Sequence, residues 1–183
     1  MDYREYQTAA GRTANRQLSQ REALANWSIG VGGETGKLQR MIGEIGSPSA
    51  PAAMEGLPSK IGDIGWYSAM LCLDAGVDFE PLVRQGLEAA AAERRSLSEL
   101  IIDLGGASGE ILEIIKHHLF HRTELWPALL AQNVEKLVAA LAGLCAALGF
   151  SFDSALERNL QDLAERYPHG FRPLTGSLIA PGA

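Results

Sequence analysis

Apolar residues along this chain recur mainly at spacings of three and four positions, which is the period of an amphipathic α-helix. Alternating apolar and polar runs, which are typical of half-buried strands, are scarce. The pattern therefore predicts an all-α protein. The expected helices are Asp2–Asn15, Ser19–Gly46, Ser59–Ala75, Glu80–Arg95, Leu97–His121, Asn133–Leu148 and Ser154–Tyr167.

Polar residues at two of these helix starts have the spacing of a capping box. Ser19 precedes Glu22 by three positions, and Ser96 precedes Glu99 in the same way. In a capping box the serine side chain accepts a hydrogen bond from an unpaired amide of the first turn, while the glutamate side chain reaches back to the serine amide. The sequence thus predicts that helices begin just after Ser19 and Ser96.

The chain repeats itself at an offset of 73 positions. This offset aligns "LCLDAGVDFEPLV" with "LCAALGFSFDSAL" and "VGGETGKL" with "LGGASGEI". A common register for glycine, cysteine and apolar positions indicates two related helical units. We expect them to pack about a pseudo-two-fold axis, as two copies in a homodimer would. The expected units are residues 1–95 and 96–171, which form one compact domain.

Glycine and proline concentrate in two further segments. Residues 46–59, "GSPSAPAAMEGLPS", predict a flexible connector between helices. The C-terminal "PLTGSLIAPGA", within residues 172–183, predicts a loose tail after the second unit.

Composition narrows the classes of function. Among 183 residues, 16 lysines and arginines face 22 aspartates and glutamates, for a net charge of −6, and no basic stripe is present, so nucleic-acid binding is disfavoured. The sequence has no run of about 20 apolar residues and no signal-like segment, so we expect no membrane span and a cytoplasmic location. Cys72 and Cys145 lie within apolar helical segments and are expected to be packed thiols.

The glycine-rich stretch "IGVGGETGKLQRM" looks at first like a phosphate-binding loop. A P-loop requires glycine, four residues, then Gly-Lys followed by serine or threonine, after a buried strand. Here Val31 stands five positions before Gly36, Leu38 occupies the hydroxyl position, and no β-branched run comes first. The stretch therefore does not predict a P-loop, and Glu34 and Lys37 need another explanation.

Four segments resemble the MazG-type all-α nucleoside triphosphate pyrophosphohydrolases in order and spacing. They are "EYQTAAGRTAN", "GVGGETGKLQRMI", "SKIGDIGWYSAMLCLDAGVDFEPL" and "ERNLQDLAERYPHGF", and the resemblance spans Tyr3 to Phe171. In that family one helix carries Glu-x-x-Glu, and a later helix carries Glu-x-x-Asp followed by Trp-Tyr. Four carboxylates hold magnesium, which activates water and neutralises the triphosphate as pyrophosphate is released. The second half, from "GGASGEILEIIKHHLFHR" onward, resembles another copy of the unit.

The first repeat departs from the family at its metal ligands. Glu-x-x-Glu is represented by Glu34-Thr-Gly-Lys37, and Glu-x-x-Asp by Lys60-Ile-Gly-Asp63. Two carboxylates are thus replaced by lysines, and the four side chains sum to zero charge. An ammonium ~4 Å from a divalent ion repels it by about 8 kcal/mol at an effective dielectric of 20. The resemblance leaves Glu34 and Asp63 as remnants of the catalytic metal site.

The second repeat keeps a single carboxylate at the corresponding positions, which are Ala107, Glu110, Asn133 and Lys136. The family's terminal Asn-x-x-Lys-Leu survives as Asn159, but Asp162 replaces its lysine. Lys116 matches a lysine that is common in the family after the first acidic motif, which suggests a former phosphate contact or, equally, a solvated cation.

The four charged residues of the first repeat have three interpretations. Residues three apart share a helix face, so Glu34 and Lys37 can meet Lys60 and Asp63 as crossed ion pairs. In a second interpretation, Lys37 and Lys60 contact a phosphate or nucleotide. In the third, metal catalysis survives, with Glu34 and Asp63 holding magnesium together with Glu110 or another carboxylate of the second repeat.

Further side chains offer weaker signals. Glu113, His117 and His121 are spaced i, i+4, i+8 and can form a zinc-binding face, or they can be solvated near a helix end. Large aromatics, namely Trp27, Trp66, Tyr67 and Trp126, are expected in the core or at an interface rather than stacking on a base.

These observations predict a MazG-like protein with degraded metal-binding motifs. We expect it to be catalytically weak or inactive and to bind a nucleotide or a protein partner. The alternative is an active magnesium-dependent pyrophosphohydrolase acting on nucleoside triphosphates, and magnesium is expected only in that case. Exposed helix faces are candidate contacts of a homodimer.

Overall fold

The computed structural model describes residues 1–45, 47, 49–121 and 123–171. These residues form seven α-helices and no strand, which confirms the all-α class. The helices are α1 (Tyr3–Gly11), α2 (Gln20–Gly43), α3 (Ala50–Ala75), α4 (Phe79–Ala92), α5 (Leu97–Phe120), α6 (Pro127–Leu148) and α7 (Phe152–Arg166).

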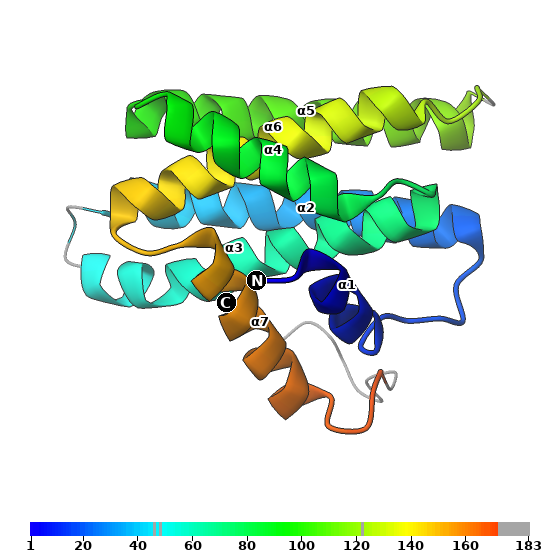
Figure 1. Cartoon of the computed structure of the whole chain (residues 1–183), viewed down its shortest axis with the longest axis horizontal. Coiled ribbons are helices and arrows are strands. Elements are labelled where there is room, and N and C mark those ends of the chain that lie inside the picture. The colour runs from blue at the N-terminus through cyan, green and yellow to red at the C-terminus, as the bar shows by residue number, and fades with distance from the viewer. Residues whose placement is uncertain (46, 48, 122, 172–183) are drawn as a thin grey trace.

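The helices share one hydrophobic core. In that core α2 packs on α3 and α5, and α6 packs on α5. Three large contacts cross between the halves of the chain: α2 packs on α5, α4 packs on α6, and α7 packs on α3. Figure 1 shows α7 and the short α1 together at the lower end of the view, beside α3. Neither half therefore covers its own core.

Both predicted capping boxes are present. The side chain of Ser19 accepts from the amide of Glu22 at the start of α2, and Ser96 does the same for Glu99 at the start of α5. At their other ends α3 and α6 stop at glycines, with Gly76 at φ 70° and Gly149 at φ 87°. Glycine is the residue that adopts this left-handed conformation at least cost.

The connector expected over residues 46–59 is largely wrong, because α3 already begins at Ala50. Pro51 lies in the first turn, where the missing amide would have been unpaired anyway. Pro58 lies inside the helix and leaves the carbonyl of Met54, a residue that is 37% exposed, without its helical amide donor. Ala53 and Leu57 are buried, and their packing holds this proline-containing segment helical.

Helix α6 begins at Pro127 rather than at the expected Asn133, and here proline occupies the first helical position. By length and composition α6 is also apolar enough to cross a membrane, but more than half of that apolar segment is buried against other helices. A core position thus accounts for its hydropathy. Cys145 on α6 and Cys72 on α3 are buried and free, as expected, and burial raises the pKa of both thiols to about 12.

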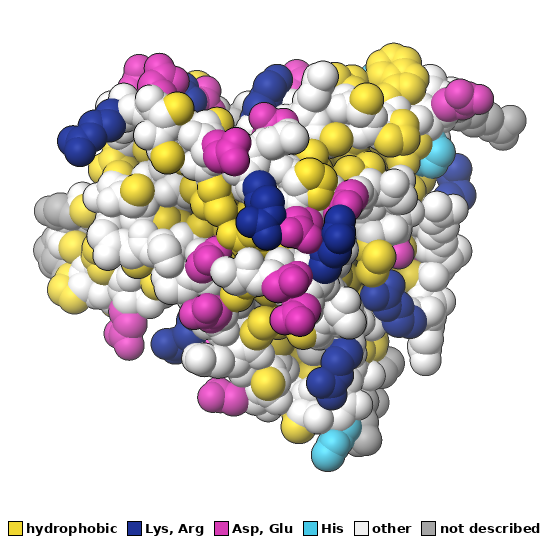
Figure 2. Space-filling view, viewed as in Figure 1, with side chains coloured by type: hydrophobic (Ala, Val, Ile, Leu, Met, Phe, Trp, Pro, Cys, Tyr) yellow, Lys and Arg dark blue, Asp and Glu magenta, His cyan; other side chains and the backbone are white. Residues whose placement is uncertain are grey.

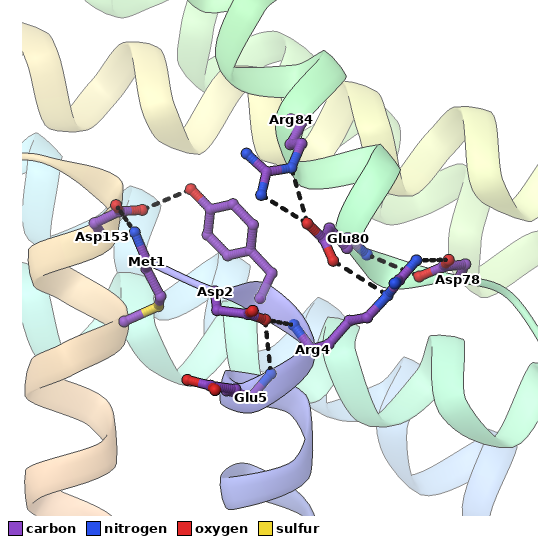
Figure 3. Close-up of polar contacts among 9 residues, drawn as sticks. Met1, Asp2, Arg4, Glu5, Asp78, Glu80, Arg84 and Asp153 are labelled. Carbon is purple, nitrogen blue, oxygen red and sulfur yellow. Dashed lines mark hydrogen bonds and ion pairs between the residues drawn. The ribbon is translucent and has the colours of Figure 1, made fainter.

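Polar contacts fix α1 between α4 and α7 (Figure 3). The Tyr3 hydroxyl donates to Asp153 Oδ1 at 2.7 Å, and the guanidinium of Arg84 lies over the Tyr3 ring at 5.6 Å. Arg4 pairs with Asp78 at 3.0 Å and with Glu80 at 3.1 Å. On the face seen in Figure 2, acidic and basic side chains are interspersed among apolar ones. The expected C-terminal tail, residues 172–183, lies outside the described residues.

Candidate functional site: a charged cleft between α2, α3 and α7

The four charged residues of the first repeat lie together between α2 and α3. Lys60 Nζ lies 2.6 Å from Glu34 Oε2 and 2.9 Å from Asp63 Oδ2. Lys37 Nζ lies 2.9 Å from Glu34 Oε1. Each helix contributes residues three positions apart, and the packing of α2 on α3 brings the two pairs into contact. Of the crossed ion pairs that the sequence offered as one of three interpretations, Glu34–Lys60 is formed, whereas Lys37 pairs with Glu34 on its own helix and not with Asp63.

Partial burial strengthens these charge contacts. The side chains of Glu34 and Lys60 are 14% and 22% exposed. Burial alone would raise the pKa of Glu34, but hydrogen bonds from Lys60 and Lys37 outweigh it and hold that pKa below 4.5. Burial would likewise lower the pKa of Lys60, but the two carboxylates raise it above 10.5. Lys60 is thus an ammonium at neutral pH, which excludes it as a nucleophile or general base.

Asn159 on α7 extends the network. Its amide donates to Asp63 Oδ1 at 3.1 Å, and the Tyr6 hydroxyl donates to Asn159 Oδ1 at 3.3 Å. Gly62 permits this approach, because a Cβ there would lie 2.5 Å from the carbonyl oxygen of Ala155 and 2.6 Å from Asn159 Cβ. Burial, and secondly the charge of Asp63, raises the pKa of Tyr6 far above its ordinary value. Tyr6 therefore stays a neutral hydrogen-bond donor.

An open cleft of about 580 Å³ borders this network, within the roughly 300–1,000 Å³ range of small-molecule sites. Five predicted site residues line it: Glu34, Lys37, Lys60, Asp63 and Asn159. Aromatic rings, side-chain amides and a further cation also line it, together with three smaller contributors: Trp27, Trp66, Tyr67, Tyr167, Phe171, Asn15, Asn26, Arg166, Thr13, Leu18 and Leu163. The cleft thus combines flat apolar surfaces with charged and hydrogen-bonding groups.

Two tryptophans support the cleft wall. Trp27 is buried, and its indole N–H donates to Asp74 Oδ2 at 2.6 Å. The Trp66 ring meets Trp27 edge-on at 5.3 Å between centroids and meets Tyr67 edge-on at 4.9 Å. Tyr67 lies over the α2 backbone at Gly30, where a Cβ would lie 2.3 Å from the ring. Trp27 and Trp66 therefore pack as expected, and Gly30 makes room for the ring of Tyr67.

Glu110 and Lys116, expected at a metal or phosphate site, do not line this cleft. Lys116 Nζ donates to Glu113 Oε2 at 2.6 Å. Glu110 lines a separate pocket of about 240 Å³ with Glu113 and His117. Trp126 borders the same pocket and is 60% exposed, so of the two places expected for it, the core or an interface, the core is wrong. The structure does not bring Glu110 together with the two carboxylates of the cleft.

The expected zinc face is partly formed. His117 Nε2 lies 2.9 Å from Glu113 Oε1, and the rings of His117 and His121 are 4.7 Å apart. Over the described part of the chain, however, no three His, Cys, Asp or Glu side chains are arranged to hold a metal ion. Two expected ligand sets are therefore not assembled: Glu34, Asp63 and Glu110, and Glu113, His117 and His121.

The sequence did not single out Tyr6, Gly30, Arg166 or Tyr167 as site residues. All four lie within segments that carry the MazG resemblance, but the roles of Tyr6, Arg166 and Tyr167 depend on how α1 and α7 dock on α3. For Gly30 the signal was a glycine inside a helical pattern, which often marks a close approach. No family model, curated protein or solved structure matches this chain.

Proposed function

We propose that this chain is a MazG-type protein in which an internal ion-pair network replaces the metal, and that it acts as a nucleotide-binding module without hydrolysis. The observation that carries this proposal is the position of Lys60. Its ammonium lies within 3 Å of carboxylate oxygens on two helices, Glu34 on α2 and Asp63 on α3. In an intact MazG motif, carboxylates at these positions would share a magnesium ion.

The donor set does not fit magnesium. Hard divalent cations require several oxygen ligands. Here the two carboxylates already accept hydrogen bonds from Lys60, and a metal between them would lie beside that ammonium. The corresponding positions of the second half offer no replacement, because Asn133 is buried with its amide donating to Leu129 O and the one carboxylate there, Glu110, lines a separate pocket. We therefore assign no step of chemistry to a metal.

Several contacts support descent from a duplicated unit. A Cβ on Gly32 would meet Leu112 at 2.7 Å, and a Cβ on Gly105 would meet Gln39 at 2.8 Å. Adding 73 to the number of Gly32 gives Gly105, and subtracting 73 from that of Leu112 gives Gln39. The second contact is therefore the equivalent of the first in the other half. The same offset maps α4 onto α7 and α6 onto α3. The packing of α4 on α6 is therefore the equivalent of the packing of α7 on α3. A pseudo-two-fold relation between the halves is the simplest account of both observations.

A pyrophosphate-release assay tests the absence of hydrolysis. With millimolar magnesium or manganese, we expect no release above background from any common ribo- or deoxyribonucleoside triphosphate. Steady turnover that disappears in both Glu34→Ala and Asp63→Ala would instead establish the alternative, an active pyrophosphohydrolase that uses these carboxylates despite Lys60. Turnover that survives both substitutions would point to a contaminating enzyme and leaves the expected result in place.

A further inference from the structure

The charged groups of the cleft are unequal in number. Lys37, Lys60 and Arg166 supply three positive charges, and Glu34 and Asp63 supply two negative charges, so the lining carries 3 − 2 = +1. Lys60 is held by both carboxylates. The other two cations of the lining, Lys37 and Arg166, are exposed, and Lys37 also pairs with Glu34 at 2.9 Å.

The aromatic side of the cleft is suited to a flat ring. Tyr67 forms part of the wall, and Tyr167 and Phe171 follow the end of α7, with ring centroids 6.0 Å apart. Asn15 and Asn26 add side-chain amides that can pair with the polar edge of a base. Rings, amides and a small positive excess thus lie in one cleft.

From these features we propose that the cleft binds a nucleoside monophosphate, without a metal, in preference to the triphosphate. This inference rests on the proposed function and specifies its ligand. The base packs against the aromatic rings, and the phosphate is bound by Arg166, whose planar guanidinium suits phosphate oxygens, with Lys37 beside it. Lys60 is the fixed internal counter-ion of Glu34 and Asp63.

Charge decides between the mono- and triphosphate. A single phosphate carries about −1.5 to −2 charges at neutral pH, which is closer in size than the charge of a triphosphate to the net charge of +1 that the lining supplies. A triphosphate carries more, and enzymes that bind it neutralise its outer phosphates with magnesium bridging their oxygens. Such a metal would lie beside the ammonium of Lys60. The additional phosphates would also approach the carboxylates of Glu34 and Asp63, which repel them.

Calorimetric titration of the whole chain tests this preference. The probes are adenosine, AMP and ATP, with cytidine, CMP and CTP as the pyrimidine series, each measured with chelator and with magnesium. We expect a monophosphate of at least one series to bind more tightly than its nucleoside and its triphosphate, with no gain from magnesium. Arg166→Ala should weaken monophosphate binding by about tenfold or more, and leave nucleoside binding unchanged.

Arg158→Ala is the matched control. Arg158 lies on the same helix, is 61% exposed, pairs with Asp162 and does not line the cleft, so its loss should change neither affinity. Triphosphates binding more tightly than monophosphates would overturn the inference but leave a nucleotide-binding module in place. Equal effects of the two arginine substitutions would also overturn it. If no nucleoside or nucleotide binds at all, the proposed function fails with it.

Discussion

At the scale of single residues, Lys60 is the side chain on which the network depends. Replacing it with methionine keeps the aliphatic packing but leaves Glu34 and Asp63 close together without their shared counter-charge. We expect Lys60→Met to lower the free energy of unfolding by about 1 to 3 kcal/mol, measured by urea denaturation. Lys37→Met is the matched control, because that side chain is 62% exposed, and it should cost less than about 1 kcal/mol. Equal losses would show that Lys60 has no special role.

The ion pairs also predict a pH dependence. The pKa of Glu34 in the folded protein lies below its ordinary value of 4.5, because the lysine hydrogen bonds outweigh burial. Its contribution to stability is therefore present above pH 4.5 and is lost as the pH falls through the folded pKa. Glu34→Gln should be less stable than the parent at pH 7, and the difference should shrink as the pH falls below 4.5.

Denaturation series at several pH values check this expectation. Glu88→Gln serves as the control, because Glu88 is exposed on α4, away from the cleft. Its stability should follow that of the parent at every pH. A difference between Glu34→Gln and the parent that stays constant down to pH 3 would contradict the assignment.

Residue spacing predicted much of this site. The i, i+3 pairs placed Glu34 with Lys37 and Lys60 with Asp63, and the resemblance to the MazG motif added Asn159. The spacing did not predict whether these four side chains would form ion pairs, bind a phosphate or hold a metal, because that depends on how closely α2 and α3 approach each other. Arg166 and Tyr6 were missed because α1 and α7 reach the cleft only through tertiary packing. Glu110 was wrongly expected at the metal site, because the sequence showed that the second repeat keeps this carboxylate but not where it lies in the fold.

At the scale of elements, α2 offers a matched pair of glycines. A Cβ at Gly30 would lie 2.3 Å from the Tyr67 ring, whereas one at Gly33 would meet nothing within 4 Å. Gly33→Ala should raise the free energy of unfolding by about 0.5 to 1 kcal/mol, because alanine is the better helix former. Gly30→Ala gains the same propensity but displaces the ring, so we expect a net loss of about 1 to 2 kcal/mol. Urea denaturation of both variants measures these differences. Stabilisation by Gly30→Ala would contradict the close contact with the Tyr67 ring.

Helix ends could be predicted from the sequence where the residues at the end itself determine them. The serine caps of α2 and α5 and the glycine ends of α3 and α6 are local features, and the capping boxes were predicted from the sequence. Pro51 and Pro127 misled the prediction, because a proline marks either a loop or the first turn of a helix. Buried neighbours such as Leu57 and Leu130 resolve that choice, and their burial is known only once the helices pack.

At the scale of the whole molecule, the chain interleaves its halves. Helix α4 covers α6, α7 covers α3, and the charged cleft needs α2 and α3 from the first half and Asn159 on α7 from the second. The 73-residue offset predicted related units in one compact domain. It did not predict that each half would supply the covering helix of the other, because sequence repetition carries no information about which copy a helix packs on.

The proposed function requires that Lys37 and Lys60 occupy positions at which carboxylates once held a metal. Lys37→Glu with Lys60→Glu would restore four carboxylates at the positions of the MazG motif. Without metal this double variant should melt below the parent, because clustered carboxylates repel one another. A metal that binds only the folded state stabilises it by mass action, and at a hundred times Kd this amounts to about 2.7 kcal/mol, or roughly 5 to 10 °C in a chain of this size.

The measurement is the melting temperature of the parent and the double variant, each with chelator and with millimolar manganese. We predict a manganese-dependent rise of that order in the double variant, a smaller rise in either single variant, and almost none in the parent. A double variant that melts at the same temperature with and without manganese, or a parent that gains as much as the variant, would contradict the claim that Lys37 and Lys60 stand where a metal was bound.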